Sequence, residues 1–231
     1  MRIAMWSGPR NLSTAMMYAF AARDDFAVWD EPFYGAYLNA TGLDHPMREA
    51  IISAGEPDPK AVAARCFGVI PETKKHFYMK HMPHHMLPDF PIKWTEECVN
   101  IHLIRHPARV VASYAAKRES PTLEDIGFRQ QVEVFERVGG VVLDSAAVRD
   151  DPEGSLMKLC ETIGLQFDPA MLSWPKGGHR SDGAWAPHWY PAVHQSTGFA
   201  GPEKALPILA GKDAKLVDLA MPYYEKMRAN L

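Results

Sequence analysis

The first residues able to do chemistry form the loop Gly8–Thr14, which follows a short apolar run and precedes a helical stretch. This order of strand, loop and helix is typical of phosphate-binding sites, because unpaired amides at a helix N-terminus point outward and the helix dipole favours an anion. Arg10 adds a positive charge, and Ser13 and Thr14 add hydroxyl donors. The loop predicts an anion site, with an ordinary strand–helix turn and a surface arginine as the alternative.

The same loop departs from the phosphate loop of nucleoside triphosphatases, G-x-x-x-x-G-K-[ST]. Gly8 matches the first glycine, but Ser13 stands at the second glycine and Thr14 at the lysine. In those enzymes the lysine and Mg²⁺ neutralise the β- and γ-phosphates. Only Asp30 and Asp144 stand at the end of an expected strand, where a carboxylate could bind the metal. The loop therefore favours an anion other than a nucleoside triphosphate.

A second cation, Arg105, follows the apolar run Val99–Ile104, and a helix is expected to begin at Pro107. Ligands of open parallel sheets bind at the carboxyl ends of the strands, so Arg105 is expected at that edge. Ser113 lies about two turns along the helix, where it and the planar guanidinium of Arg105 can share one phosphate. The alternative role for Arg105 is a salt bridge to a surface carboxylate.

The elements that must position these residues alternate between apolar runs and helical stretches. Strands are expected over Arg2–Ser7, Phe26–Asp30, His76–Lys80, Val99–Ile104 and Val141–Asp144. Helices are expected over Asn11–Ala22, Pro59–Val69, Pro107–Arg118, a stretch from a Thr122–Asp125 capping box to about Val138, Pro152–Ile163 and Lys212–Asn230. This alternation predicts crossover units and a parallel sheet in an α/β protein.

Length and composition limit the other possibilities. The 231 residues carry 25 basic and 28 acidic side chains, a net charge of −3, which argues against non-specific nucleic-acid binding. The sequence has no apolar run of about 18 residues, so no membrane span is expected. Three distant cysteines predict neither a disulfide framework nor a zinc ribbon, and a reducing cytoplasm is the expected location. We expect one domain over residues 1–231, in which residues 167–206 form an irregular lid or loop region.

Four segments, in order over residues 3–165, carry a resemblance to a known family. Arg105–Tyr114 reads R-x-P-x-x-V-x-x-S-Y and resembles the 3′-phosphate-binding segment of the sulfotransferases that use 3′-phosphoadenosine-5′-phosphosulfate. Pro9–Thr14 is similar to their 5′-phosphosulfate loop, and His81–Pro88 to the H-L-P-x-x-L-L-P stretch after their third strand. Asp151–Glu153 resembles the start of their D-P-x-x-x-L segment.

The resemblance implies a three-layer, P-loop NTPase-like α/β fold with a central parallel sheet flanked by helices. It also implies transfer of a sulfuryl group from 3′-phosphoadenosine-5′-phosphosulfate to a hydroxyl or amine of a small-molecule acceptor, with adenosine 3′,5′-bisphosphate as product and no metal required. The residues that it assigns to the donor are Arg10, Asn11, Leu12, Ser13 and Thr14 at the 5′ end, Arg105 and Ser113 at the 3′-phosphate, and Lys176 in a loose counterpart of the family's C-terminal R-K-G.

Two positions in the first loop depart from the family pattern. Leu12 replaces a glycine, which leaves the loop backbone less free to wrap an anion. Arg10 replaces the lysine of cytosolic members, as in bacterial and carbohydrate-acting members. Arg10 is the expected catalytic cation on the bridging oxygen, where negative charge develops as the bond to the leaving phosphate breaks.

The acceptor must lose a proton, which calls for a general base. The resemblance places His81 in that role, at the end of the third expected strand. Glu31 competes with it, since Glu31-Pro32-Phe33 resembles the E-P-[FL] segment of carbohydrate sulfotransferases. Lys80 is a candidate second cation on the transferring group. A zinc site built on the histidines near His81 is disfavoured, because adjacent side chains point in different directions and no carboxylate completes the set.

The same residues are also compatible with two other functions. One is a kinase-like enzyme of the same fold, which would require ATP with Mg²⁺. The other is a non-catalytic protein that keeps the nucleotide cradle. The sequence fixes neither the acceptor nor the oligomeric state.

Overall fold

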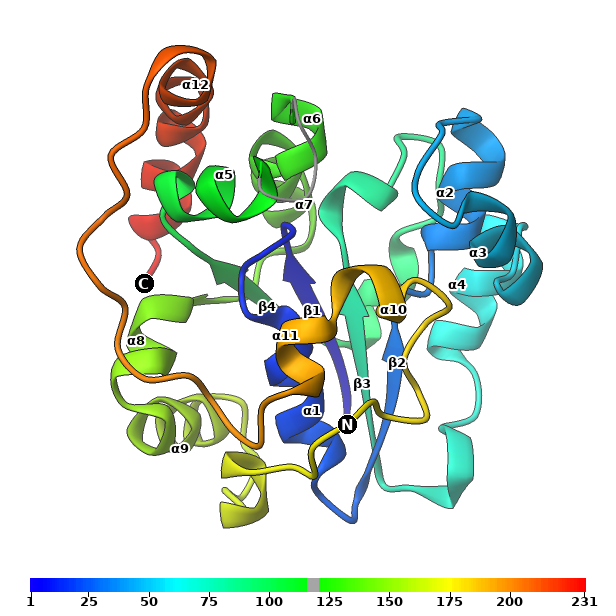
Figure 1. Ribbon diagram of the computed structural model, residues 1–231. Coiled ribbons are helices and arrows are strands. Elements are labelled where there is room, and N and C mark those ends of the chain that lie inside the picture. Colours follow the sequence, from blue (N-terminus) through cyan, green and yellow to red (C-terminus); the bar gives the residue numbers. More distant parts are fainter. Residues whose placement is uncertain (116–120) are drawn as a thin grey trace.

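The computed structural model describes residues 1–115 and 121–231. A five-stranded sheet forms its centre, in the order β2-β3-β1-β4-β5, and every strand pair is parallel (Figure 1). The strands are β1 (Arg2–Ser7), β2 (Phe26–Asp30), β3 (His76–His81), β4 (Val99–Ile104) and β5 (Val141–Asp144). Because all five are parallel, their carboxyl ends lie along one edge of the sheet.

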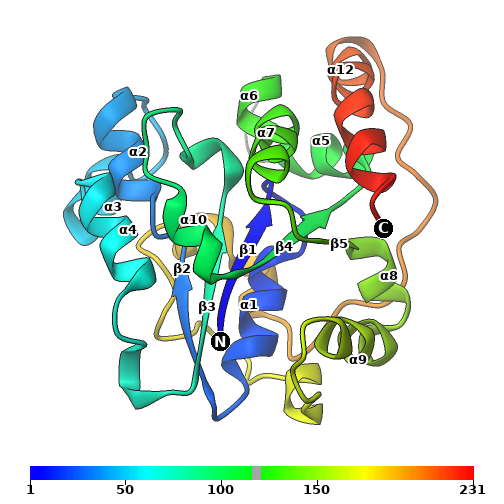
Figure 2. The same cartoon turned by 180° about the vertical axis from the view of Figure 1, so that it is seen from behind.

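Alternate side chains of the strands enter two separate apolar cores. Ile3 and Met5 of β1 pack with α1 (Ser13–Ala21), α8 (Ser145–Asp150) and α9 (Pro152–Thr162) on one face. Ala4 and Trp6 pack on the other face, where the partners are α4 (Pro59–Phe67) and α7 (Phe128–Val138). Figure 1 views the face covered by α1, and Figure 2 shows the opposite face. The predicted arrangement of a parallel sheet between two helical layers is confirmed.

A further helical group packs beside β4 and β5. It contains α5 (Pro107–Ala115), α6 (Leu123–Ile126) and the C-terminal α12 (Gly211–Arg228), which share one apolar cluster with part of α7. The capping box at Thr122 is present, but the helix that it starts ends at Gly127, whose φ of 69° is left-handed. The single helix predicted to Val138 is therefore two. The predicted helix Pro107–Arg118 is observed to Ala115, and its residues 116–118 lie outside the described residues.

Among the described residues outside 167–206, three helices have no counterpart among those predicted: α2 (Tyr34–Thr41), α3 (Arg48–Ala54) and α8. Residues 167–206 contain a 3₁₀ turn at Pro169–Leu172 and the short helices α10 (Ala186–Trp189) and α11 (Pro191–His194). In Figure 1, α10 and α11 lie in front of the sheet, close to α1 and β3. Among the described residues, no helix combines the length and the hydropathy needed to cross a bilayer.

Candidate active site

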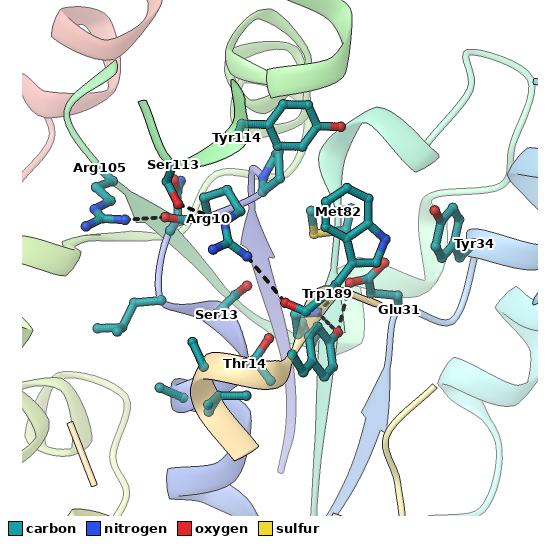
Figure 3. Close-up of a pocket in the computed structure, with 18 of the residues that line it drawn as sticks. Arg10, Ser13, Thr14, Glu31, Tyr34, Met82, Arg105, Ser113, Tyr114 and Trp189 are labelled. Atoms are coloured by element: carbon teal, nitrogen blue, oxygen red, sulfur yellow. Dashed lines mark hydrogen bonds and ion pairs between the residues drawn. The ribbon is translucent and has the colours of Figure 1, made fainter. Parts of the chain in front are cut away.

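A cavity of about 290 Å³ opens at the carboxyl edge of the sheet. Residues 9–15 form one wall, and Lys80, Arg105 and Ser113 come from the ends of β3 and β4 and from α5. Residues 192–200 and α10 border it from the irregular segment. Figure 3 shows Arg105, Ser113 and Arg10 at one end, and Glu31 and Tyr34 at the other.

The first loop has the geometry of an anion cradle. Leu12 is the N-cap of α1 with φ 75° and ψ 4°, and its side chain provides no acceptor for the first-turn amides. Those amides and the hydroxyls of Ser13 and Thr14 border the cavity. A Cβ on Gly8 would lie 2.8 Å from the carbonyl oxygen of Ile126, so this position needs glycine. Leucine adopts the left-handed backbone in place of the family's glycine, despite the strain.

Strained backbone concentrates at this cavity. Six described residues other than glycine have positive φ, and three of them, Arg10, Leu12 and Glu31, line it. Their φ values are 62°, 75° and 40°. Such conformations cost about 1–3 kcal/mol each and collect at binding and catalytic sites. The strain therefore marks the same edge of the sheet that the sequence predicted.

The two arginines predicted to hold the two ends of a nucleotide meet at this cavity. Arg10 donates from Nε to Ser113 Oγ at 2.9 Å, and Arg105 donates from Nη1 to the carbonyl oxygen of Arg10 at 2.6 Å (Figure 3). Burial and the nearby charge of Arg105 lower the pKa of Arg10. Ser113 thus contacts Arg10, whereas it was expected to share an anion with Arg105.

Arg105 also takes part in what we call the basic cluster: Arg105, Arg109, Arg149 and Glu203. The Glu203 carboxylate accepts from Arg105 Nε at 2.9 Å and from Arg149 Nη1 at 3.1 Å, and it lies 2.6 Å from Arg109 Nε. The Glu203 side chain is only 4% exposed. Arg105 therefore does pair with a carboxylate, as its alternative role predicted. The carboxylate is the buried side chain of a residue 98 positions away, and not one on the surface.

On the other side of the cavity lies what we call the acidic cluster: Asp30, Glu31, Lys80 and Tyr190. Lys80 Nζ donates to Asp30 Oδ1 at 2.9 Å, to Glu31 Oε1 at 2.5 Å and to the Tyr190 hydroxyl at 2.7 Å. The Trp185 indole donates to that hydroxyl at 2.8 Å. All four members are buried. The segment that carries α10 thus closes over the ends of β2 and β3.

Burial and charge act in opposite directions inside the acidic cluster. Burial raises the pKa of Glu31, although the Lys80 charge opposes this. Burial alone would lower the pKa of Lys80, but the carboxylates of Asp30 and Glu31 outweigh it and raise that pKa. Lys80 therefore stays protonated at neutral pH. Glu31 is a carboxylate with increased proton affinity at the cavity wall, which is what a general base requires.

His81 faces away from this wall. It lies on the side of β3 opposite to Lys80, and its ring packs 4.7 Å from Trp6 and 4.8 Å from Trp94 between ring centroids. It is not among the residues that line the cavity. Burial and then the charge of Lys80 lower the pKa of His81 to about 3. The expectation that the strand end brings His81 to the ligand edge is therefore wrong, because β3 runs on to His81 and the side chain alternation places it in the core.

Some of the remaining residues predicted from the sequence line the cavity, and one lies outside it. Glu31, Lys80, Asn11 and the other loop residues line the cavity, but Lys176 is exposed and does not. No local motif marks Tyr190 or Glu203, because each reaches the sheet edge from the irregular segment, and neither was among the predicted site residues. Among residues 1–115 and 121–231, no group of three or more histidine, cysteine or acidic side chains is placed to hold a metal ion.

Histidines and aromatic rings line the end of the cavity near α2. His85 stacks on Tyr34 and Tyr37, with ring centroids 4.3 and 4.9 Å apart, and lies beside His84. Burial lowers the pKa of His84 to about 3 and that of His85 well below its ordinary value. These rings are therefore neutral at pH 7 and offer an uncharged wall.

Comparison with solved structures agrees with this architecture. The sulfotransferase domain of the Synechococcus PCC 7002 olefin synthase superposes with a TM-score of 0.59 at 18% identity, covering 96% of this chain and 94% of that one. A sulfotransferase from Alicyclobacillus acidocaldarius gives a TM-score of 0.51 at 12% identity, covering 99% and 95%. At such identities the likeness concerns the fold, which is the P-loop-like fold that the sequence predicted.

Two curated relatives come from Arabidopsis thaliana and are named branched-chain-amino-acid aminotransferase-like proteins 2 and 1. They are 33% and 34% identical over 235 residues, which cover 99% of this chain and 42% of each relative. The chain thus spans less than half the length of these relatives. The sequence model of the family described as "Sulfotransferase domain" matches residues 1–231. That match takes in every segment on which the resemblance rested, and the chain belongs to the sulfotransferase domain family.

Proposed function

We propose that this protein transfers a sulfuryl group from 3′-phosphoadenosine-5′-phosphosulfate to a hydroxyl or amine of a small acceptor. The observation that carries the proposal is the hydrogen bond between Arg105 and the backbone of Arg10 at one cavity. It joins a cationic, glycine-dependent loop at a helix N-terminus to a second cationic centre on the next strand. A protein that binds both anionic ends of one nucleotide needs such a pair of cationic sites.

The residues of the first loop suit a phosphosulfate. The first-turn amides of α1 have no side-chain cap, and Ser13, Thr14 and Arg10 add donors around the same space. When bound, the donor supplies a sulfuryl group and a phosphate that gains negative charge as the sulfur–oxygen bond breaks. Arg10 places a positive charge where that charge develops, so its contribution is larger in the transition state than in the ground state.

Glu31 is the proposed general base, in place of His81. Its Oε1 accepts from Lys80 and Tyr190, which leaves Oε2 to take the proton from the acceptor. The acceptor oxygen or nitrogen then forms its bond to sulfur. Lys80 fixes the orientation of the carboxylate and keeps positive charge close to the transferring group. The neutral wall near Tyr34 and His85 is the proposed acceptor side.

Isothermal titration with adenosine 3′,5′-bisphosphate, in buffer containing a chelator and no Mg²⁺, tests the donor site. We expect saturable binding under these conditions and none of comparable strength for ATP with Mg²⁺. The opposite preference would replace the proposal with a kinase-like function. Binding of the bisphosphate together with no sulfated product across a broad panel of phenols, alcohols and amines would indicate a nucleotide-binding protein without turnover.

A further inference from the structure

The basic cluster has more positive charge than its partner can neutralise. Three guanidinium groups surround one carboxylate, that of Glu203, which leaves an excess of two positive charges. The pKa of Asp144 is raised, mainly by burial and to a smaller extent by the nearby negative charge of Glu203. A phosphate monoester dianion offers two charges and three acceptor oxygens, so it would satisfy these arginines better than a carboxylate.

The chain around Glu203 is held mainly by the same arginines. Residues 200–206, which we call the Glu203 segment, contain no helix or strand. Arg149 donates to the carbonyl oxygen of Gly201 at 2.6 Å, and Arg109 donates to that of Lys204. The flanking residues Pro202 and Lys204 are exposed. Release of the carboxylate therefore disturbs little apolar packing.

The Glu203 segment also borders the cavity. Ala200 lines it, and Arg105 connects the two, since its Nη1 reaches the first loop while its Nε holds Glu203. We propose that the Glu203 carboxylate occupies the position of the donor's 3′-phosphate and is displaced when a 3′-phosphorylated nucleotide binds. This inference rests on the proposed function. It makes Glu203 a specificity-determining residue, because a nucleotide without a 3′-phosphate has nothing with which to replace it.

The test compares adenosine 3′,5′-bisphosphate with adenosine 5′-monophosphate on the wild-type protein and on Glu203→Gln, by isothermal titration without Mg²⁺. Gln keeps the shape but loses the charge that competes with phosphate. We expect the variant to bind the bisphosphate about tenfold more tightly, with the monophosphate changed by less than about twofold. Glu225→Gln is the matched control, because Glu225 forms an exposed pair with Arg228 and should change neither affinity.

Two results separate this inference from the function on which it rests. If the wild-type protein binds the bisphosphate and Glu203→Gln does not tighten it, or tightens both nucleotides equally, the inference fails and the proposed function stands. If neither protein binds the bisphosphate, both fail.

Trypsin gives a second readout on the unmodified protein. The Lys204–Ala205 bond lies in the Glu203 segment, where Arg109 holds the Lys204 carbonyl oxygen. We expect the bisphosphate to accelerate cleavage after Lys204 and the monophosphate to leave its rate unchanged. Protection of this bond by the bisphosphate would show that the segment stays in place, and would overturn the inference.

Discussion

The acidic and basic clusters are both ion networks at the carboxyl edge of the sheet, the first buried and the second half-buried around the buried Glu203 side chain, but their charge balance is opposite. In the acidic cluster one lysine faces two carboxylates, and in the basic cluster one carboxylate faces three arginines. An unbalanced buried network is costly unless a further charge completes it. The difference teaches which partner each lacks: the first can accept a proton, and the second can accept an anion.

The largest expected effect comes from breaking the acidic cluster at its proposed base. Glu31→Gln keeps an acceptor for Lys80 but cannot take a proton. We expect kcat to fall by ~10²–10⁴ with the affinity for adenosine 3′,5′-bisphosphate nearly unchanged, because only the reacting step uses the carboxylate. Steady-state kinetics and titration measure the two quantities separately. Wild-type turnover in this variant would remove Glu31 from the mechanism.

Charge imbalance also predicts a large loss of stability when the single cation is removed. Lys80→Met leaves the buried carboxylates of Asp30 and Glu31 unpaired. We expect the free energy of unfolding to fall by ~3–5 kcal/mol, as for other broken buried pairs. Urea denaturation of Lys226→Met, which breaks an exposed pair with Glu136, should show a loss below ~1 kcal/mol. Equal losses in the two variants would contradict the comparison.

Breaking the basic cluster should affect nucleotide binding rather than turnover. Arg105→Ala removes the link between the first loop and Glu203. We expect the bisphosphate to bind more weakly by ~1.5–3 kcal/mol, the value of a charged hydrogen-bond partner. Arg129→Ala, which loses a surface pair on α7, is the control. Unchanged affinity would remove the 3′-phosphate assignment.

The pH profile sharpens the contrast between the clusters. A carboxylate can act as the proposed base only when ionised, so kcat should rise with pH through the pKa of Glu31, and burial raises that pKa above the ordinary value for glutamate. The acidic limb should therefore lie at higher pH than an exposed carboxylate would give. It should disappear from the residual activity of Glu31→Gln. An identical limb in that variant would assign the titration to another group.

The smallest effect is expected at His81, outside both clusters. Because its ring packs between Trp6 and Trp94, His81→Gln should lower stability while kcat changes by less than about threefold. Steady-state kinetics on the folded variant measure this. A fall in kcat of two orders of magnitude would indicate that His81 is the base and that Glu31 is not.

The sequence predicted the strands well because each is a short apolar run that ends in polar or loop residues. Four of the five expected ranges agree with the structure, and β3 extends one residue further, to His81. That single residue changes which side chain we propose as the base, because strand alternation turns His81 to the core and Lys80 to the cavity. Helix α2 was missed since its N-cap, Phe33, gives no capping signal. Helix α8 begins directly after β5, with Asp144 as its N-cap, and the sequence marked Asp144 only as a strand end.

The candidate site likewise contains residues that could be predicted from the sequence and residues that could not. Arg10 and Arg105 could be predicted because each follows a strand, and the carboxyl ends of parallel strands share an edge. Tyr190 and Glu203 could not, since each approaches from more than 90 residues away through a segment without periodicity. Long-range approach of this kind depends on how the irregular segment folds back over the sheet.

The left-handed backbone at Arg10, Leu12 and Glu31 has a further consequence. Folding has already forced these residues into place, so little reorganisation remains when a ligand arrives, and the cavity is preorganised. The strained backbone lowers the stability of the whole fold, but it holds the site in its binding geometry before a ligand binds. Substitutions that relax these three positions should therefore stabilise the fold at the expense of catalysis.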